Sequence, residues 1–174
     1  MKNISHGFTL VELMVTVVVA GILLTVGVPS LVSMYEGNRA RSAISNIEST
    51  MLFARSQAVS YGSRVSVCPF NGSSCDADWT KGFSVFIDNG ALGTLDATNG
   101  IQDTVLRTVD GVNNKDFIKS TQSRYTFNAD GLVHLASGGT LVYCAGDKSN
   151  PDSRGITIGV SGRISAIETA VNCN

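Results

Sequence analysis

The sequence is poor in charged residues. Only 16% of its 174 residues are Asp, Glu, Lys or Arg, and the formal net charge at pH 7 is −1. A chain without an excess of basic residues lacks the usual signature of a nucleic-acid-binding protein, although a local basic patch is not excluded. Glycine, by contrast, is plentiful, with 18 residues. This composition suits a small domain rich in strands and turns.

Histidine, the most frequent general base of enzymes, is scarce. The chain has two, His6 and His134. A Ser-His-Asp arrangement built on His134 would need a reactive serine, and Ser161 comes nearest to the G-x-S-x-G pattern. The match fails because Arg163 stands where the second glycine is required. We therefore expect no catalytic residue, no cofactor and no enzymatic activity.

Charge is missing altogether between Leu13 and Tyr35, where most positions are Val, Leu, Ile, Met, Ala or Gly. More than 18 such residues form a helix long enough to cross the hydrocarbon core of a bilayer. Glu12 stands just inside the apolar start of this stretch. A charged side chain at mid-bilayer costs about 2.5–3.5 kcal/mol, so Glu12 is a candidate functional residue.

The residues around Glu12 resemble the amino-terminal signal of type IV pilins and type II secretion pseudopilins. In that signal a short polar leader ends in glycine, and Phe-Thr-Leu-(Val/Ile)-Glu and an apolar helix follow. Here Ser5-His6-Gly7 precedes Phe8-Thr9-Leu10-Val11-Glu12. The resemblance implies that prepilin peptidase cuts between Gly7 and Phe8 and methylates the new amine of Phe8. It also implies that Glu12 faces the terminal amine of a neighbouring subunit during assembly.

The same resemblance divides the chain into four parts. Residues 1–7 are the leader, 8–35 a transmembrane and assembly helix, 36–61 an amphipathic helix, and 62–174 a β-rich domain. Pro29 removes a backbone donor inside the apolar helix, so we expect a kink there. The implied location is the bacterial inner membrane, with a single span and the domain in the periplasm, and then the pilus tip.

An apolar stripe continues beyond Tyr35 at helical spacing. Its members are Ala40, Ile44, Ile47, Met51, Ala54 and Ala58. Residues three and four apart share one helix face, so this stripe predicts an amphipathic helix that packs on the protein's own sheet rather than on a partner helix. Tyr61-Gly62 supplies a stop signal. We expect one helix from Thr9 to Ser60.

The remaining sequence predicts short strands separated by turns. We therefore expect an α+β fold, in which the long amino-terminal helix packs on an antiparallel β-sheet domain, as in pilins. Asn128 to Gly131 and Ser161-Gly162 are tight-turn signals. The expected strands are 64–68, 82–87, 104–109, 117–118, 125–127, 132–135, 140–144, 156–160 and 163–167.

Four cysteines follow the apolar segment, and an even number there suggests two disulfides and an oxidising compartment. Three pairings are possible. We favour Cys68–Cys75, which encloses the Asn71-Gly72 turn signal, and Cys144–Cys173, which would hold the carboxyl end. The spacings do not fit a zinc site, so we expect no metal ligated by cysteine.

Several stretches of the domain are similar to the GspH/FimT group of minor pilins and pseudopilins. They are 54–58, 64–69, 78–83, 87–88 and 161–163. The cysteine pairs resemble the pilus members FimU and FimT more than the secretion pseudopilin GspH. The resemblance implies a minor pilin, most like FimU, in a tip complex that primes the filament. The implied partners are other minor pilins, the major pilin, prepilin peptidase and the inner membrane. A type II secretion pseudopilin is the closer alternative.

A DNA-binding competence pilin is the other alternative, since FimT-type pilins are linked to DNA capture through a Gly-Arg-x-Arg motif. The matching stretch here is Gly162-Arg163-Ile164-Ser165, which lacks the second arginine. Loss of one cation weakens the phosphate neutralisation that drives such binding. Lys148, Arg154 and Arg163 could still form a cluster, although acidic residues lie among them. We expect a solvated surface instead.

Acidic and amide side chains gather between Asp88 and Asp103. Asp88, Asn89, Asp96, Asn99 and Asp103 could offer oxygen ligands to Ca²⁺. Their spacing does not match an EF-hand loop, and Asp, Asn and Gly are also ordinary turn residues. We expect turns here and no calcium site.

Overall fold

The structure is a computed structural model that describes residues 9–97, 102–167, 169 and 171–173. Contacts divide the chain into two compact units, one that ends at Tyr35 and one that begins at Glu36.

One long helix, α1 (Leu10–Tyr61), runs through both units, close to the predicted Thr9–Ser60. Thr9 caps its start, because the backbone N–H of Glu12 donates to the Thr9 side-chain oxygen over 3.2 Å. Thr9 and Glu12 have the spacing of a capping box, which the sequence analysis overlooked. The helix ends before Gly62, whose φ of 62° lies in the left-handed region where glycine is favoured. Pro29 lies inside α1, and its kink stays a prediction.

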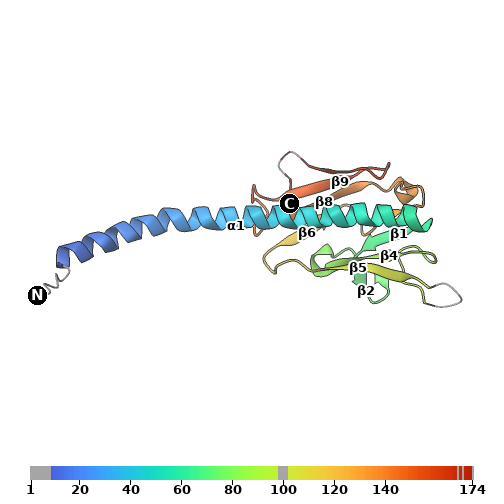
Figure 1. The fold of residues 1–174 in the computed structure, drawn as a ribbon, viewed down its shortest axis with the longest axis horizontal. Helices are drawn as coiled ribbons and strands as arrows, with labels where there is room; N and C mark the ends of the chain where they lie inside the picture. The colour runs from blue at the N-terminus through green and yellow to red at the C-terminus, as the bar shows by residue number, and fades with distance from the viewer. Residues whose placement is uncertain (1–8, 98–101, 168, 170, 174) are drawn as a thin grey trace, which may run out of the picture. The chain divides into compact units, whose positions relative to one another are not determined.

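The second unit holds two antiparallel sheets of four strands and a small ribbon. The first sheet has the order β5-β4-β1-β7 and the second the order β10-β9-β8-β6 (Figure 1). The first contains β1 (Val65–Cys68), β4 (Gly82–Ile87), β5 (Thr104–Asp110) and β7 (Tyr125–Phe127). The second contains β6 (Phe117–Ser120), β8 (Gly139–Cys144), β9 (Arg154–Ile158) and β10 (Ile164–Ala166). The ribbon pairs β2 (Phe70–Asn71) with β3 (Ser74–Cys75), and short 3-10 turns form η1 (Trp79–Lys81) and η2 (His134–Ala136).

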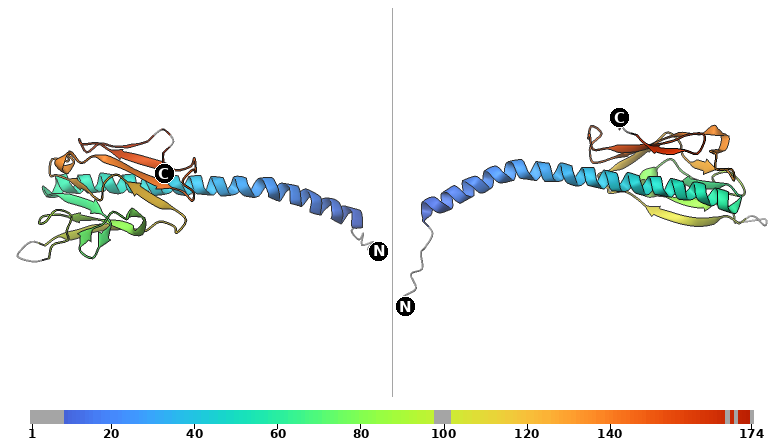
Figure 2. Two further views of the ribbon diagram at one scale, coloured as in Figure 1. Left: turned by 180° about the vertical axis from the view of Figure 1, so that it is seen from behind. Right: turned by 45° about the horizontal axis from the view of Figure 1, so that its top comes forward.

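Both sheets pack on the second half of α1, with β8 and β9 on one side and β1 and β4 on the other (Figure 2). Ala40, Ala54 and Ala58 have no exposed surface. The predicted stripe therefore faces the protein's own sheets, apart from Ile44, which is half-buried. The largest side chains of the shared core come from η1 and the strands, and include Trp79, Tyr125, Phe127, Leu141, Tyr143 and Ile156.

Both favoured disulfides are confirmed. Cys68–Cys75 closes the β2–β3 ribbon, and Cys144–Cys173 joins β8 to the carboxyl end of the chain. Val142, Cys144 and Cys173 form a small second core with Phe117 and Val171.

The predicted strand over 132–135 is wrong. Only Val133 makes a bridge, to Phe127, and the chain then turns into η2. The reason is competition for the backbone, because the N–H of Val133 donates to the carbonyl of Val160 over 3.1 Å. The turn signal itself was right, since the N–H of Gly131 donates to the carbonyl of Asn128. β9 begins two residues before the predicted 156–160, and the short β2 and β3 were missed.

A charged tie links α1 to the second sheet. Arg39 contacts both carboxylate oxygens of Asp116 at 2.7 Å, and the Asp116 side chain is fully buried. The hydroxyl of Tyr143 and the N–H of Gly146 also donate to that carboxylate, over 2.5 and 2.8 Å. Burial opposes ionisation of Asp116, but these donors outweigh it and lower its pKa below the ordinary value. Burial, with the carboxylate beside it, raises the pKa of Tyr143 to about 12.

A second tie joins α1 to two turns. The Arg55 Nε donates to the carbonyl of Gly131 over 3.0 Å, and its NH2 group reaches the carbonyl of Ser161 at 3.5 Å. Gly162 packs against the same turn with a φ of 75°, and a Cβ added there would overlap the Gly131 carbonyl oxygen. Gly162 is therefore required by the fold.

We predict that Asp116→Asn lowers the free energy of unfolding by about 2–3 kcal/mol at neutral pH, because it breaks a buried ion pair. A lowered pKa stabilises the fold above the unfolded value near 4, and this contribution is lost as the pH falls through the folded value. The difference between wild type and variant should therefore vanish in acid. Urea unfolding of the full chain in detergent, followed by fluorescence of the buried Trp79, measures it. Asp110→Asn, at an exposed position, is the control, and an equal loss there would contradict the prediction.

We also predict that Gly162→Ala lowers the free energy of unfolding by about 2 kcal/mol or more. The added Cβ would clash with the backbone carbonyl of Gly131, and alanine disfavours the positive φ of this position. Gly159→Ala is the matched control in the same turn, because a Cβ there meets nothing nearer than 3.5 Å. The same urea titration compares the two variants. Equal stability of both would show that the hairpin does not need its glycine.

Candidate functional site

The apolar surface of the first unit is the largest uncovered feature of the chain. Every Val, Leu, Ile, Met and Tyr from Leu10 to Tyr35 is at least 49% exposed. By length and composition α1 can cross a membrane, with a mean hydropathy of 2.4 over its most apolar 18 residues. A patch of this size is not left in water, so lipid or other helices must cover it.

Glu12 is the acidic residue in the first turn of this apolar helix, and it is exposed. Its carboxylate lies three residues beyond the Thr9 cap, near the positive end of the helix dipole, where negative charge is favoured. The predicted cleavage and methylation residues, Gly7 and Phe8, lie outside the described residues. The contact between Glu12 and a neighbouring amine therefore stays a prediction.

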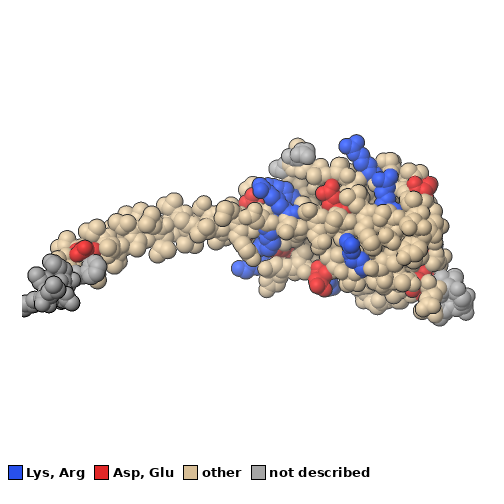
Figure 3. Space-filling view, viewed as in Figure 1, with Lys and Arg blue, Asp and Glu red and all other residues tan. Residues whose placement is uncertain are grey.

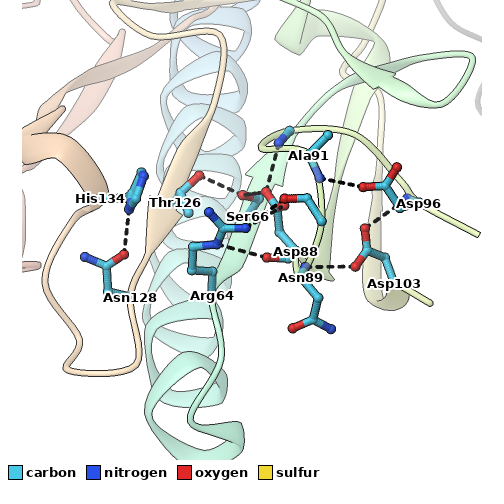
Figure 4. A network of polar contacts seen from close by, with 12 residues as sticks. Arg64, Ser66, Asp88, Asn89, Ala91, Asp96, Asp103, Thr126, Asn128 and His134 are labelled. Atoms are coloured by element: carbon cyan, nitrogen blue, oxygen red, sulfur yellow. Dashed lines mark hydrogen bonds and ion pairs between the residues drawn. The ribbon is translucent and has the colours of Figure 1, made fainter. Parts of the chain in front are cut away.

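The acidic loop after β4 uses its carboxylates to bind its own backbone (Figure 4). Asp96 accepts the N–H of Ala91 over 2.6 Å, and Asp103 accepts those of Asn89 and Asp96 over 2.9 Å. Among the described residues no group of three or more His, Cys, Asp or Glu is arranged to hold a metal ion. Asn99, the fifth candidate ligand, lies outside them. The acidic side chains whose contacts the structure describes act here as turn residues.

Asp88 has a structural part in the first sheet that the sequence analysis missed. Its side chain is fully buried, accepts the hydroxyl of Ser66 over 2.6 Å and the N–H of Gly93 over 2.9 Å, and lies 4.0 Å from Arg64. Ser66 in turn shares a hydrogen bond of 2.7 Å with Thr126 (Figure 4). The network joins β1, the end of β4 and β7. The sequence feature that could have revealed this role is an Asp directly after an apolar strand.

His134 lies in η2 and is half-buried, and not in the strand predicted over 132–135. Its Nδ1 is 2.8 Å from the side-chain oxygen of Asn128 (Figure 4). That partner is an amide and not a carboxylate, so His134 lacks the acidic residue that orients a catalytic histidine.

The three basic candidates do not form one cluster. Arg154 begins β9, and Lys148 lies in the loop before it, whereas Arg163 follows the far end of that strand. Five strand residues span about 13 Å between the two ends. Arg154 donates to the carbonyls of Pro151 and Ser153 and lies 3.9 Å from Asp152. On the face shown in Figure 3, acidic and basic side chains are scattered over the domain and form no continuous basic stripe.

Two models of known protein families match this chain, one over most of the second unit and one over the amino-terminal part. The family model described as "Type II transport protein GspH" matches residues 43–162, which is more than half of the chain. A model described as "Prokaryotic N-terminal methylation motif" matches residues 2–28. The comparison with curated proteins gave no match.

Three solved structures are similar to this one. Two are crystal structures of the type IV minor pilin FimU of Pseudomonas aeruginosa strain PAO1. One is 26% identical and covers 77% of this chain and 96% of its own, with a TM-score of 0.58. The other is 25% identical and covers 77% and 99%, also with a TM-score of 0.58. The third is the minor pseudopilin EpsH of the Vibrio cholerae type 2 secretion system, 14% identical, covering 74% and 95%, with a TM-score of 0.47.

These matches identify a structural protein rather than an enzyme. The methylation motif implies processing by prepilin peptidase, and the family implies other pilins as partners. A single apolar amino-terminal helix is typical of prepilins anchored in the inner membrane. The chain belongs to the GspH family of minor pilins and pseudopilins and carries the amino-terminal methylation motif of that class.

Proposed function

We propose that this protein is a minor type IV pilin that joins a tip complex and primes pilus assembly. Its leader is removed between Gly7 and Phe8, Phe8 is methylated, and the chain waits in the inner membrane with its domain in the periplasm. The observation that carries the proposal is a wholly uncovered apolar helix, with one acidic residue at its start, in front of a domain similar to FimU.

The role of Glu12 follows from electrostatics. A carboxylate inside an apolar medium needs a positive partner, and the desolvated charge is costly until it finds one. The amine of Phe8 in a neighbouring subunit would supply that charge. The pairing would set the axial register of the two helices while their apolar side chains pack.

The secretion alternative has an observation in its favour, because the matching family model is described by a type II transport protein. Pilus and secretion members share the helix and the domain, so the two functions differ in their partners. We favour the pilus because FimU, a type IV minor pilin, is 26% identical to this protein and covers 77% of the chain, with a TM-score of 0.58.

We predict that Glu12→Gln reduces the amount of this protein in sheared surface filaments at least about tenfold, since the amide offers no charge to the amine. Glu12→Asp keeps the charge and should retain much of the incorporation. Immunoblots of sheared and membrane fractions from the native bacterium measure both, with mass spectrometry for a methylated Phe8 terminus. Wild-type incorporation of Glu12→Gln would contradict the assembly role.

Deletion of the gene distinguishes the two systems. Loss of surface pili with unchanged export of type II substrates is the expected result. Normal pili with lost export would assign the protein to the secretion system instead.

We further predict that the full chain in detergent does not bind duplex DNA at 50 mM salt, because the candidate cations Lys148, Arg154 and Arg163 do not form one cluster and Arg154 lies beside Asp152. Fluorescence anisotropy with labelled DNA at about 50 and 200 mM salt measures this. Binding that falls steeply with salt and is lost in Arg163→Ala would instead make the protein a DNA-uptake pilin.

A further inference from the structure

A small pocket opens where the edge of β7 meets η2 and the loop after β4. Its volume is about 100 Å³. Three segments line it, through Leu92, Gln122, Ser123, Arg124, Thr126, His134, Leu135 and Ser137. The acidic loop contributes Leu92 to this lining, but none of its carboxylates.

The backbone on one side of the pocket is strained. Leu135 and Ala136 have φ values of 53° and 52°, and they are the non-glycine residues with positive φ in the described part of the chain. An L-residue in this region costs about 1–2 kcal/mol, and the turn places Leu135 in solvent, 76% exposed. No residue of this turn is buried, so packing does not explain the strained backbone. Strained backbone of this kind is often found at binding sites.

The pocket also has a cationic character. Arg124 lines it, and the described lining residues include no Asp or Glu. Among the described residues no carboxylate forms an ion pair with Arg124. Its stem lies over Gly93, where an added Cβ would come within 2.9 Å of the Arg124 Cδ. Gly93 thus leaves the space in which this arginine rests beside the pocket.

We propose that this pocket binds an acidic side chain and the apolar side chain two residues after it, which share one face of an extended segment of another pilin subunit. The carboxylate would pair with Arg124 and accept hydrogen bonds from the polar lining, and charge-assisted bonds of this kind are strong. The apolar side chain would pack on Leu135 and Leu92. The choice of a pilin as the partner rests on the proposed function.

Fluorescence anisotropy with the full chain in detergent tests this proposal. The probe is a labelled tetrapeptide, blocked at both ends, with the sequence threonine, aspartate, threonine, leucine. Saturable binding below about 1 mM is expected. A peptide with asparagine for aspartate should bind about tenfold more weakly, because the charge-assisted contact is lost. Replacement of its leucine by alanine should also weaken binding.

Two variants of the protein probe the two contacts. Arg124→Gln should weaken binding of the acidic peptide about tenfold and leave the asparagine peptide unaffected. Leu135→Gly removes the apolar contact and relieves the backbone. It should therefore bind more weakly while its thermal midpoint stays at or above that of the wild type. Leu132→Ala, at an exposed leucine of the same turn that does not line the pocket, is the matched control.

Equal binding of the two peptides, or wild-type binding by Arg124→Gln, would overturn the proposal. So would no saturable binding below 1 mM. Displacement by free acetate at the peptide's own concentration would show a pocket for small carboxylates and not for a pilin segment. Because the assay contains no filament, its failure is separate from any failure of pilus assembly, which sheared fractions report.

Discussion

The domain depends on the close approach of two sheets to a single helix face. Ala40, Ala54 and Ala58 have no exposed surface, and their methyl groups allow strands on both sides to come near the helix axis. Larger side chains from the sheets then fill the space. Trp79 and Tyr125 are fully buried with their polar atoms paired, to the carbonyl of Gln122 and to Ser120 and Thr140. A larger residue at one of the alanines would separate the layers that the whole core needs.

Three arginine side chains connect the helix to distant loops and strands of the domain. Arg39 reaches Asp116, 77 residues away, and Arg55 reaches Gly131, 76 residues away. Arg107 of β5 lies over the ring of Phe53, with 4.1 Å from its guanidinium carbon to the ring centroid. Each contact joins the helix to a different part of the domain. The turns and edges far along the chain are therefore held by the same element that forms the core.

Sequence patterns correctly predicted the elements whose formation depends on interactions between residues close together in the chain. The helix stripe, the glycine stop at Gly62 and the strand over 82–87 each depend on neighbouring residues, and each is confirmed. The strand predicted over 132–135, after the turn signal, did not form, because the N–H of Val133 donates to a carbonyl 27 residues away, at Val160. A hydrogen bond between residues so far apart in the sequence cannot be predicted from the residues next to either partner. The partners of Asp116 and Asp88 were missed for the same reason, since an acid that balances a distant arginine resembles an ordinary loop acid in the sequence.

Recognition in this family has to use surfaces that the shared fold does not already use. The apolar stripe of α1 and the inner faces of the sheets are buried against each other in the core. In the acidic loop, the described carboxylates accept hydrogen bonds from the loop's own backbone. The η2 turn differs from them, because two residues there hold an unfavourable φ while one of them exposes a leucine. Backbone strain of this kind clusters at binding sites and switch regions, and glycine at either position would relieve it. Its retention beside a cationic pocket is what separates this turn from the rest of the surface as a place for a partner to bind.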